Sequence, residues 1–248
     1  MIRAVVLDLD GVLVDSEQLW DEARRKVVAR QGGRWPPEGT SDMQGMSSPE
    51  WSAYLRDRAG LEIDRQEIVD EVVDDLLALL RRELPLIPGA REAVRRLARR
   101  WPLALASSAN RVVIDAVLAA ADLRGAFAAT VSSEEVARGK PAPDVYLEAV
   151  RRLGQSPELC VAVEDSANGI RSAASAGLRV VAVPNPHFPP SPEALALATV
   201  VLPRISELTV AFLRSAVDGG EAVEARLDEQ EVESFPASDP HSDWAGPA

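Results

Sequence analysis

An apolar segment at residues 4–7 ends abruptly in the sequence Asp8-Leu9-Asp10-Gly11. Side chains alternate between the two faces of a β-strand, so the two carboxylates would share one face at the carboxyl edge of that strand. Neighbouring carboxylates repel each other unless a cation or a proton lies between them. The pattern suits a divalent-metal site in which one carboxylate attacks and the other moves a proton. A strand followed by an acidic turn would show the same residues, and Gly11 would then only permit the turn.

Apolar segments and helical patterns alternate over the second part of the chain. Further strands are predicted at residues 103–106, 128–132, 160–163, 180–183 and 200–202. Helices are predicted between them at residues 89–100, 111–121, 143–153 and 167–176. Strands that alternate with helices predict an α/β fold with a doubly wound parallel sheet.

Residues 16–85 interrupt this alternation, because they show only helical spacing. Helices are predicted at residues 16–30, with Ser16 as the N-cap, at 48–59 and at 65–83. We therefore expect a catalytic core built from residues 1–15 and 86–217, with a small helical domain inserted after the first strand. Residues 16–85 are called the helical insertion below.

Charge and composition exclude several classes of partner. The net charge of −12 and the pI near 4.7 argue against a nucleic-acid partner, which would need many Lys and Arg side chains. Residues 218–248 hold nine acidic residues and one basic residue, and we expect this tail to be disordered. No apolar stretch reaches the length of a membrane span, and the single Cys160 lies in an apolar segment. These features fit a cytoplasmic protein that needs no membrane.

The remaining polar residues of interest follow the predicted strands. Ligands of open parallel sheets bind at the carboxyl ends of the strands. That edge would collect Asp8, Asp10, Ser107, Lys140, Glu164 and Asp165. Each has an ordinary alternative, since Ser107 and the Glu164-Asp165 pair could cap helices and Lys140 could be a solvated loop residue. Four converging acids would repel strongly, however, and a hard divalent ion such as Mg²⁺ would relieve this repulsion.

Four ordered motifs resemble those of the haloacid dehalogenase superfamily. They are Asp8-Leu-Asp10-Gly with the following Val-Leu-Val-Asp-Ser-Glu, Ser107 after an apolar strand, Gly-Lys140-Pro-Ala-Pro-Asp, and Glu164-Asp165-Ser-Ala-Asn-Gly. The resemblance covers about residues 1–213 and is strongest for the sugar-phosphate phosphatases related to 2-deoxyglucose-6-phosphate and hexitol phosphatases. It implies a Rossmann-like core, with the helical insertion as a cap over the site.

The resemblance also implies a mechanism and a set of site residues. Asp8 would form an aspartyl-phosphate, Asp10 would act as the general acid and base, and Ser107 and Lys140 would bind the phosphoryl oxygens. Mg²⁺ would be held by Asp8, the Asp10 carbonyl and Asp165, with Glu164 close by. Residues expected near the substrate are Gly11, Glu17, Trp20, Gln44, Gly45, Ser108 and Asn110. The expected function is hydrolysis of small phosphomonoesters, such as sugar or polyol phosphates, by a monomer.

Two other functions are compatible with these motifs. A hexose-phosphate mutase related to β-phosphoglucomutase would need to hold a bisphosphate. This chain has Trp20 where that enzyme has a histidine, and Ser48 where it has an arginine that grips the second phosphate. A binding protein that keeps the fold without catalysis would have no need for the complete set of motif residues. A phosphonatase is disfavoured, because it would need an amine in the cap for a Schiff base, and the only lysine there, Lys26, follows Arg24 and Arg25 on a helix where a solvated role fits better.

Overall fold

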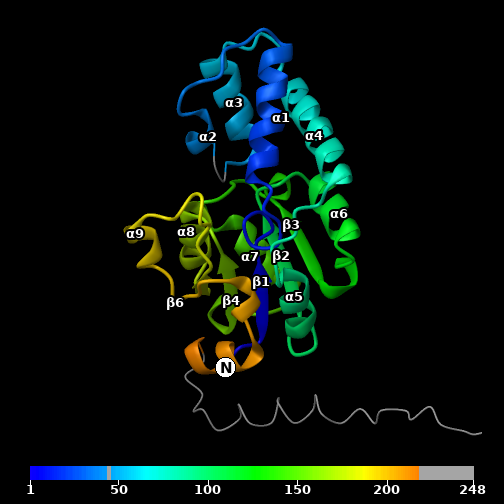
Figure 1. The fold of residues 1–248 in the computed structure, drawn as a ribbon. Helices are drawn as coiled ribbons and strands as arrows, with labels where there is room; N and C mark the ends of the chain where they lie inside the picture. The colour runs from blue at the N-terminus through cyan, green and yellow to red at the C-terminus, as the bar shows by residue number, and fades with distance from the viewer. Residues whose placement is uncertain (44–45, 218–248) are drawn as a thin grey trace, which may run out of the picture.

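The computed structural model describes residues 1–43 and 46–217. The predictions made for Gln44, Gly45 and the tail at residues 218–248 therefore lie outside the described residues. Six parallel strands form one sheet in the order β3-β2-β1-β4-β5-β6, as predicted for a doubly wound α/β fold (Figure 1). The strands are β1 (Ala4–Leu7), β2 (Leu103–Ser107), β3 (Ala129–Ser132), β4 (Cys160–Glu164), β5 (Arg179–Ala182) and β6 (Val200–Val201).

The strands read as continuous apolar runs because both faces of the sheet are buried. In β1, Val5 and Leu7 belong to one hydrophobic cluster, whereas Ala4 and Val6 belong to a second cluster on the opposite face. All four side chains are fully buried. The register places Leu7 beside Leu105 of β2 and Val163 of β4, so the three strands end at the same edge of the sheet.

Helices cover both faces of the sheet. The first cluster includes side chains of α5 (Ala90–Ala98) and α6 (Arg111–Ala120), and the second includes side chains of α7 (Asp144–Arg152) and α8 (Ala167–Ser175). The shorter elements are α9 (Pro192–Leu195), α10 (Val210–Phe212), η1 (Arg124–Ala126), η2 (Ser133–Glu135), η3 (Pro157–Leu159), η4 (Ile205–Glu207) and η5 (Leu213–Val217). Every strand and long helix predicted from the sequence is present, with boundaries that differ by two residues or fewer.

The helical insertion forms a bundle above the carboxyl edge of the sheet (Figure 1). Its helices are α1 (Glu17–Arg30), α2 (Gly39–Asp42), α3 (Ser48–Ala59) and α4 (Arg65–Arg82). The apolar stripe of α4 includes Ile68, Val72 and Leu76, which are fully buried within the first hydrophobic cluster. Asp64 caps α4 by accepting a hydrogen bond from the Gln66 amide at 2.8 Å. The short α2 was not predicted, because a single helical turn shows no periodicity.

Two paired segments of the chain connect the helical insertion to the sheet. The Asp15 amide donates to the Pro85 carbonyl at 2.8 Å, and the Ile87 amide donates to the Leu13 carbonyl at 3.0 Å. Val14 and Leu86 form an antiparallel bridge between these two bonds. The two connections therefore cross side by side as one short two-stranded ribbon, which lies directly after the Asp8-Leu9-Asp10-Gly11 turn.

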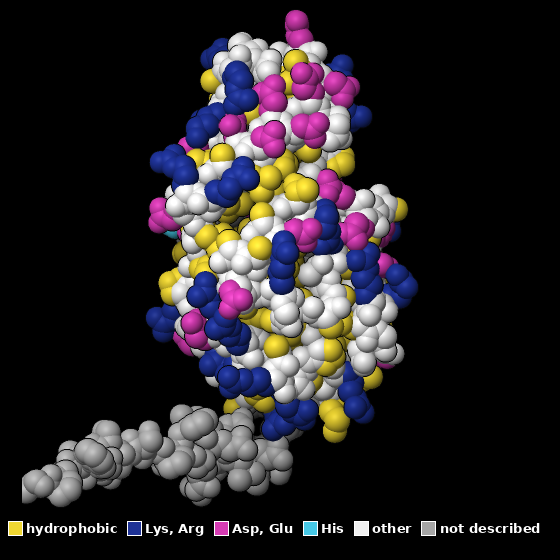
Figure 2. Space-filling model, turned by 90° about the vertical axis from the view of Figure 1, so that its right-hand side faces the viewer, with side chains coloured by type: hydrophobic (Ala, Val, Ile, Leu, Met, Phe, Trp, Pro, Cys, Tyr) yellow, Lys and Arg dark blue, Asp and Glu magenta, His cyan; other side chains and the backbone are white. Residues whose placement is uncertain are grey.

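Charged side chains are distributed unevenly over the surface. On the face shown in Figure 2, acidic side chains gather on the helical insertion, whereas Lys and Arg side chains gather on the lower part of the core. Apolar side chains are visible at the waist between the two parts. Among the described helices, none combines the length and the apolar character that a membrane crossing would require.

Candidate active site

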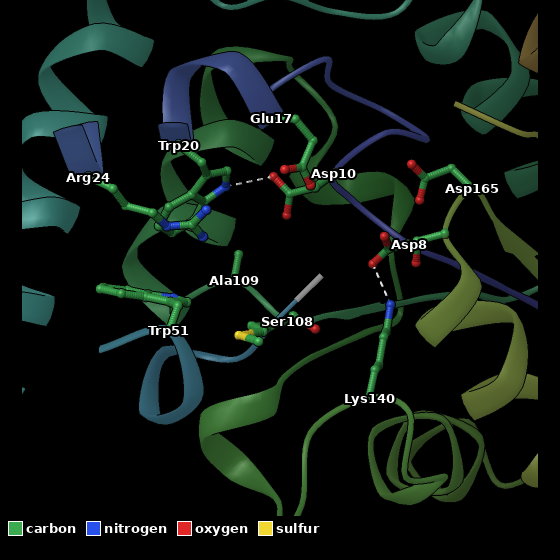
Figure 3. A pocket seen from close by; sticks show the side chains of 12 residues that line it. Asp8, Asp10, Glu17, Trp20, Arg24, Trp51, Ser108, Ala109, Lys140 and Asp165 are labelled. Carbon is green, nitrogen blue, oxygen red and sulfur yellow. Dashed lines mark hydrogen bonds and ion pairs between the residues drawn. The ribbon is translucent and has the colours of Figure 1, made fainter. Parts of the chain in front are cut away.

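The candidate site lies at the carboxyl edge of the sheet, where three neighbouring strands end. Asp8 directly follows β1, Ser107 is the last residue of β2, and Glu164 is the last residue of β4. Lys140 reaches the same place from the segment before α7, and its side chain is 3% exposed. The structure thus brings together the acidic and basic residues that the sequence placed at this edge (Figure 3).

Lys140 links two buried carboxylates. Its Nζ atom lies 2.7 Å from Asp8 Oδ1 and 2.6 Å from Glu164 Oε1. The Tyr146 hydroxyl also donates to Glu164 Oε1, at 2.8 Å. Burial alone would lower the pKa of Lys140, but the charges of Asp8 and Glu164 outweigh this effect and raise the pKa above its ordinary value. Lys140 is therefore a fixed ammonium ion at physiological pH.

Asp8, Glu164 and Asp165 form a group of three buried carboxylates. Oxygen atoms from the three side chains lie within 4.8 Å of one another. Burial raises the pKa of Asp8 to about 8 against the opposing effect of Lys140, and burial and the neighbouring carboxylates raise the pKa of Asp165 well above its ordinary value. One ammonium cannot balance three carboxylates. A divalent cation with oxygen ligands would supply the two missing positive charges, so this donor set fits Mg²⁺.

Gly11 lets the first turn approach Asp165 closely. A Cβ atom at this position would lie 1.8 Å from Asp165 Oδ2, and the backbone of Gly11 has a φ of +75°. A larger residue would be strained here, both because its Cβ atom would clash with Asp165 and because the backbone is left-handed. Gly11 is not among the residues that line the pocket between the sheet edge and the helical insertion, so its place beside Asp165 accounts for this residue better than the substrate contact predicted from the sequence.

Asp10 points away from Asp8 and toward the helical insertion. Its Oδ1 atom accepts hydrogen bonds from the Ser16 hydroxyl and from Trp20 Nε1, the latter at 3.1 Å. Its Oδ2 atom lies 3.5 Å from the Ser107 hydroxyl. Ser16 was predicted to cap α1, but its side chain makes no capping bond because it binds Asp10 instead. Asp10 is thus held at the boundary between the core and the insertion.

A pocket of about 40 Å³ lies between the sheet edge and the helical insertion. Its core wall includes Asp8, Asp10, Ser108, Lys140 and Asp165, and its wall on the insertion includes Glu17, Trp20, Arg24, Met46 and Trp51 (Figure 3). Glu17 and Trp20 therefore lie where the sequence placed them. Burial raises the pKa of Glu17 to about 7, despite the opposing charge of Arg24.

Other predicted residues lie beside the pocket rather than on its wall. Ser107 is fully buried, and its hydroxyl accepts a hydrogen bond from the Ala109 amide at 3.0 Å. Asn110 accepts a hydrogen bond from the Ser48 hydroxyl at 2.8 Å and donates one to Glu134 Oε1 at 2.6 Å. Ser48 begins α3, so Asn110 joins the core to the insertion.

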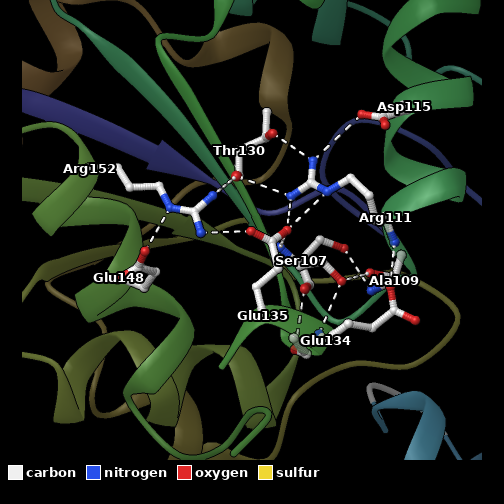
Figure 4. A network of polar contacts seen from close by, with 11 residues as sticks. Ser107, Ala109, Arg111, Asp115, Thr130, Glu134, Glu135, Glu148 and Arg152 are labelled. Atoms are coloured by element: carbon white, nitrogen blue, oxygen red, sulfur yellow. Dashed lines mark hydrogen bonds and ion pairs between the residues drawn. The ribbon is translucent and has the colours of Figure 1, made fainter. Parts of the chain in front are cut away.

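A network of ion pairs supports the loop that follows β2 (Figure 4). Arg111 donates to the Glu135 carboxylate and to the Thr130 hydroxyl, and Arg152 donates to Glu135 and Glu148. Burial raises the pKa of Glu135, but the hydrogen bonds from the two arginines outweigh this effect and lower it. The network ties α6, β3 and α7 together behind the loop that carries Ser107 and Ser108.

Five residues of the pocket wall were not predicted from the sequence: Arg24, Met46, Trp51, Ala109 and Ser166. Arg24 could have been found, because Glu17, Trp20 and Arg24 follow helical spacing and fall on one face of the helix. An aromatic residue on a helix, such as Trp51, is ordinarily expected in the core. Trp51 is 1% exposed, as a core residue would be, and it also faces the pocket.

Comparisons with known proteins agree with this geometry. A model of the haloacid dehalogenase-like hydrolases matches residues 2–177. Hexitol phosphatase B of Escherichia coli K12 is 36% identical over 225 residues, which is 84% of this chain and 95% of that protein. Protein CbbY of Rhodobacter capsulatus is 32% identical over 206 residues, which is 75% of this chain and 87% of that protein.

Solved structures show the same fold. The structure of CbbY from Rhodobacter sphaeroides in complex with phosphate has a TM-score of 0.78 and 28% identity, and the match covers 88% of this chain and all of that one. A β-phosphoglucomutase from Clostridium difficile has a TM-score of 0.77 over 88% of this chain and 98% of its own. Its identity of 20% supports a similarity of fold alone.

Proposed function

Because the chain belongs to the haloacid dehalogenase-like hydrolases, we propose that it is a Mg²⁺-dependent phosphatase of small sugar or polyol phosphates. The observation that carries this proposal is the buried cluster of Asp8, Glu164, Asp165 and Lys140, of which Asp8, Lys140 and Asp165 line the pocket below the helical insertion. The similarity to hexitol phosphatase B over 84% of the chain supports the choice of substrate class.

Asp8 is the nucleophile in this proposal, and Asp10 is the general acid and base. An Asp8 oxygen forms a bond to phosphorus while the bond to the ester oxygen breaks, and Asp10 gives its proton to the leaving alcohol. Asp10 then takes a proton from water as the water attacks phosphorus and releases Asp8. The position of Asp10 between the core and the insertion suits contact with a leaving group that lies under the insertion.

Asp8 and Asp165 are the side chains best placed to hold Mg²⁺. Both Glu164 oxygens already accept hydrogen bonds, Oε1 from Lys140 and Tyr146 and Oε2 from the Asp165 and Ser166 amides. Glu164 therefore positions Lys140 beside Asp8. When bound, Mg²⁺ would neutralise charge on the phosphoryl oxygens, and Lys140 adds a second positive charge at the same place.

The helical insertion acts as the cap in this proposal. The pocket of about 40 Å³ is too small for a hexitol phosphate, which has more than ten non-hydrogen atoms. Substrate entry therefore requires the insertion to move away from the core, and its return excludes bulk water from Asp8. The paired connections at residues 13–15 and 85–87 are the segments about which this movement would occur.

A phosphate-release screen tests the proposal. The panel contains sorbitol 6-phosphate, glucose 6-phosphate, a nucleoside 5′-phosphate, a phosphonate and glucose 1,6-bisphosphate, each with Mg²⁺ and with a chelator. We expect phosphate release from the monoesters with Mg²⁺ and none with chelator. Undiminished release with chelator would contradict the metal requirement, and interconversion of sugar phosphates without phosphate release would show a mutase.

A further inference from the structure

Arg24 is a buried cation on the pocket wall without a charged hydrogen-bonding partner. Its side chain is buried, with 5% of the residue exposed, and its Nε atom has no hydrogen-bond partner. Within residues 1–43 and 46–217, the Arg24 guanidinium forms no ion pair. The guanidinium lies against two indole rings, with Cζ 5.1 Å from the centroid of Trp20 and 5.3 Å from that of Trp51. Cation–π contacts offset only part of the cost of burying this charge. They also leave N–H donors of the Arg24 guanidinium for hydrogen bonds to a ligand.

Arg24 shares one face of α1 with Glu17 and Trp20, and Trp20 donates a hydrogen bond to Asp10. Glu17, Trp20 and Arg24 are three and then four positions apart, so they form a stripe along the helix that faces the pocket (Figure 3). Asp8 and Lys140 form the opposite wall. If the ester phosphate binds at Asp8, as the proposed function requires, its leaving group lies against this stripe.

The charges around Arg24 disfavour a second anion. Burial disfavours its charged form, while Glu17, Asp21 and Asp10 favour it through their negative charges. Three acids near one guanidinium make this end of the pocket unattractive to a second phosphate. A hydroxyl group suits it better, because Arg24 can donate to the oxygen and Glu17 can accept the proton. The two indoles would pack against the carbon chain.

We propose that Arg24, which lies against the rings of Trp20 and Trp51, is a specificity-determining residue that selects a neutral, polyhydroxylated leaving group. This inference rests on the proposed function and deepens it. Buried donors built for hydroxyl groups discriminate strongly against a ligand without them, because the donors are then left unpaired. Arg24 therefore favours a polyol monophosphate over both an aryl phosphate and a sugar bisphosphate.

The test compares Arg24→Met with Lys26→Met. Methionine keeps an unbranched, adaptable side chain between the indoles and removes only the charge and the donors. Lys26 lies on the same helix, is exposed, and forms an ion pair with Glu22 away from the pocket wall, so it serves as the matched control. For Arg24→Met, the ratio of kcat/KM for sorbitol 6-phosphate to that for phenyl phosphate should fall by about 10- to 100-fold, mainly through KM. Lys26→Met should keep the wild-type ratio.

Calorimetric titration separates this inference from the proposed function. In an Asp8→Asn background with Mg²⁺, Arg24→Met should weaken binding of sorbitol 6-phosphate more than binding of glucose 1,6-bisphosphate. A larger loss for the bisphosphate would show that Arg24 reads an anion, and an equal loss for sorbitol 6-phosphate and phenyl phosphate would show a merely structural role. If the wild type releases no phosphate, the proposed function fails. If Asp8→Asn binds sorbitol 6-phosphate equally well with and without Arg24→Met, or not at all in either case, the role of Arg24 is overturned.

Discussion

Replacing Gly169 by alanine should destabilise this protein, although alanine is the better helix former. Gly169 lies in the first turn of α8, and a Cβ atom there would lie 1.9 Å from the carboxyl carbon and from Oε1 of Glu164. Non-bonded atoms do not approach so closely, so the carboxylate must move. It would leave Lys140 Nζ, now at 2.6 Å, and the Tyr146 hydroxyl, now at 2.8 Å.

The size of the effect follows from these contacts. Helix propensity alone would stabilise the alanine variant by about 1 kcal/mol. Each hydrogen bond to a charged group is worth about 1.5–3 kcal/mol, so loss of the bonds from Lys140 and Tyr146 costs about 3–6 kcal/mol. The free energy of unfolding should therefore fall by about 2–5 kcal/mol. The same displacement frees Lys140 from one partner, so turnover should fall as well.

Urea unfolding followed by tryptophan fluorescence measures the loss. Gly125→Ala is the matched control, because nothing lies within 4 Å of its Cβ position, and it should change stability by about 0.5 kcal/mol or less. Glu164→Asp shortens the carboxylate by one methylene, so the double variant with Gly169→Ala should regain part of the loss. A Gly169→Ala protein as stable as the wild type, or more stable, would refute this account of Glu164.

Four further results are expected. Asp8→Asn should abolish turnover and any covalent phosphoenzyme seen by mass spectrometry, and a phosphoenzyme in this variant would exclude Asp8 as the nucleophile. Asp10→Asn should slow hydrolysis of an alkyl phosphate about 10²–10⁴-fold but an activated aryl phosphate much less, and equal losses would argue against general-acid catalysis. Burial raises the pKa of Glu17 to about 7, so its ionisation lowers the free energy of unfolding as the pH rises from 4.5 to 7. In urea titrations, Glu17→Gln should therefore raise the free energy of unfolding by up to about 3 kcal/mol at pH 8 but by little at pH 5. Burial likewise raises the pKa of Asp8, to about 8, so the folded state retains a proton that the unfolded state releases. The metal-free protein should therefore lose stability between about pH 4 and pH 8. Mg²⁺ should therefore raise Tm more at pH 8 than at pH 6, and an equal rise at both would contradict this.

The sheet could be predicted because each strand and each helix shows its own pattern of apolar residues in the sequence. Each strand is a short apolar run whose side chains enter two cores, and each long helix has a buried stripe that recurs at helical spacing. The strand ends then placed Asp8, Lys140, Glu164 and Asp165 at one edge without further information. Short elements such as α2 and α9 were not predicted, because four residues are too few to show a period.

The directions of side chains could not be predicted in the same way. The sequence suggests Ser16 as a helix cap, but in the fold the Asp10 carboxylate is a stronger acceptor within reach. Asn110 was expected near the substrate, yet Ser48 and Glu134 occupy its amide group. Such choices depend on which groups from distant segments arrive at the same place. Helical spacing could have placed Arg24 on the same face as Glu17 and Trp20, but only the tertiary structure shows its contacts with the rings of Trp20 and Trp51.

The use of lysine at position 140 follows from the space available to the cation. The chain has 27 Lys and Arg residues, and Lys140 is one of only two lysines among them. Its Nζ atom fits between Asp8 and Glu164 at 2.7 and 2.6 Å, and it lies 5.1 Å from the centroid of the Tyr146 ring. A compact ammonium can meet two carboxylates on different sides, whereas a planar guanidinium directs its donors into one plane and needs more room. Of the two lysines, the buried one is thus the one whose surroundings favour an ammonium over a guanidinium.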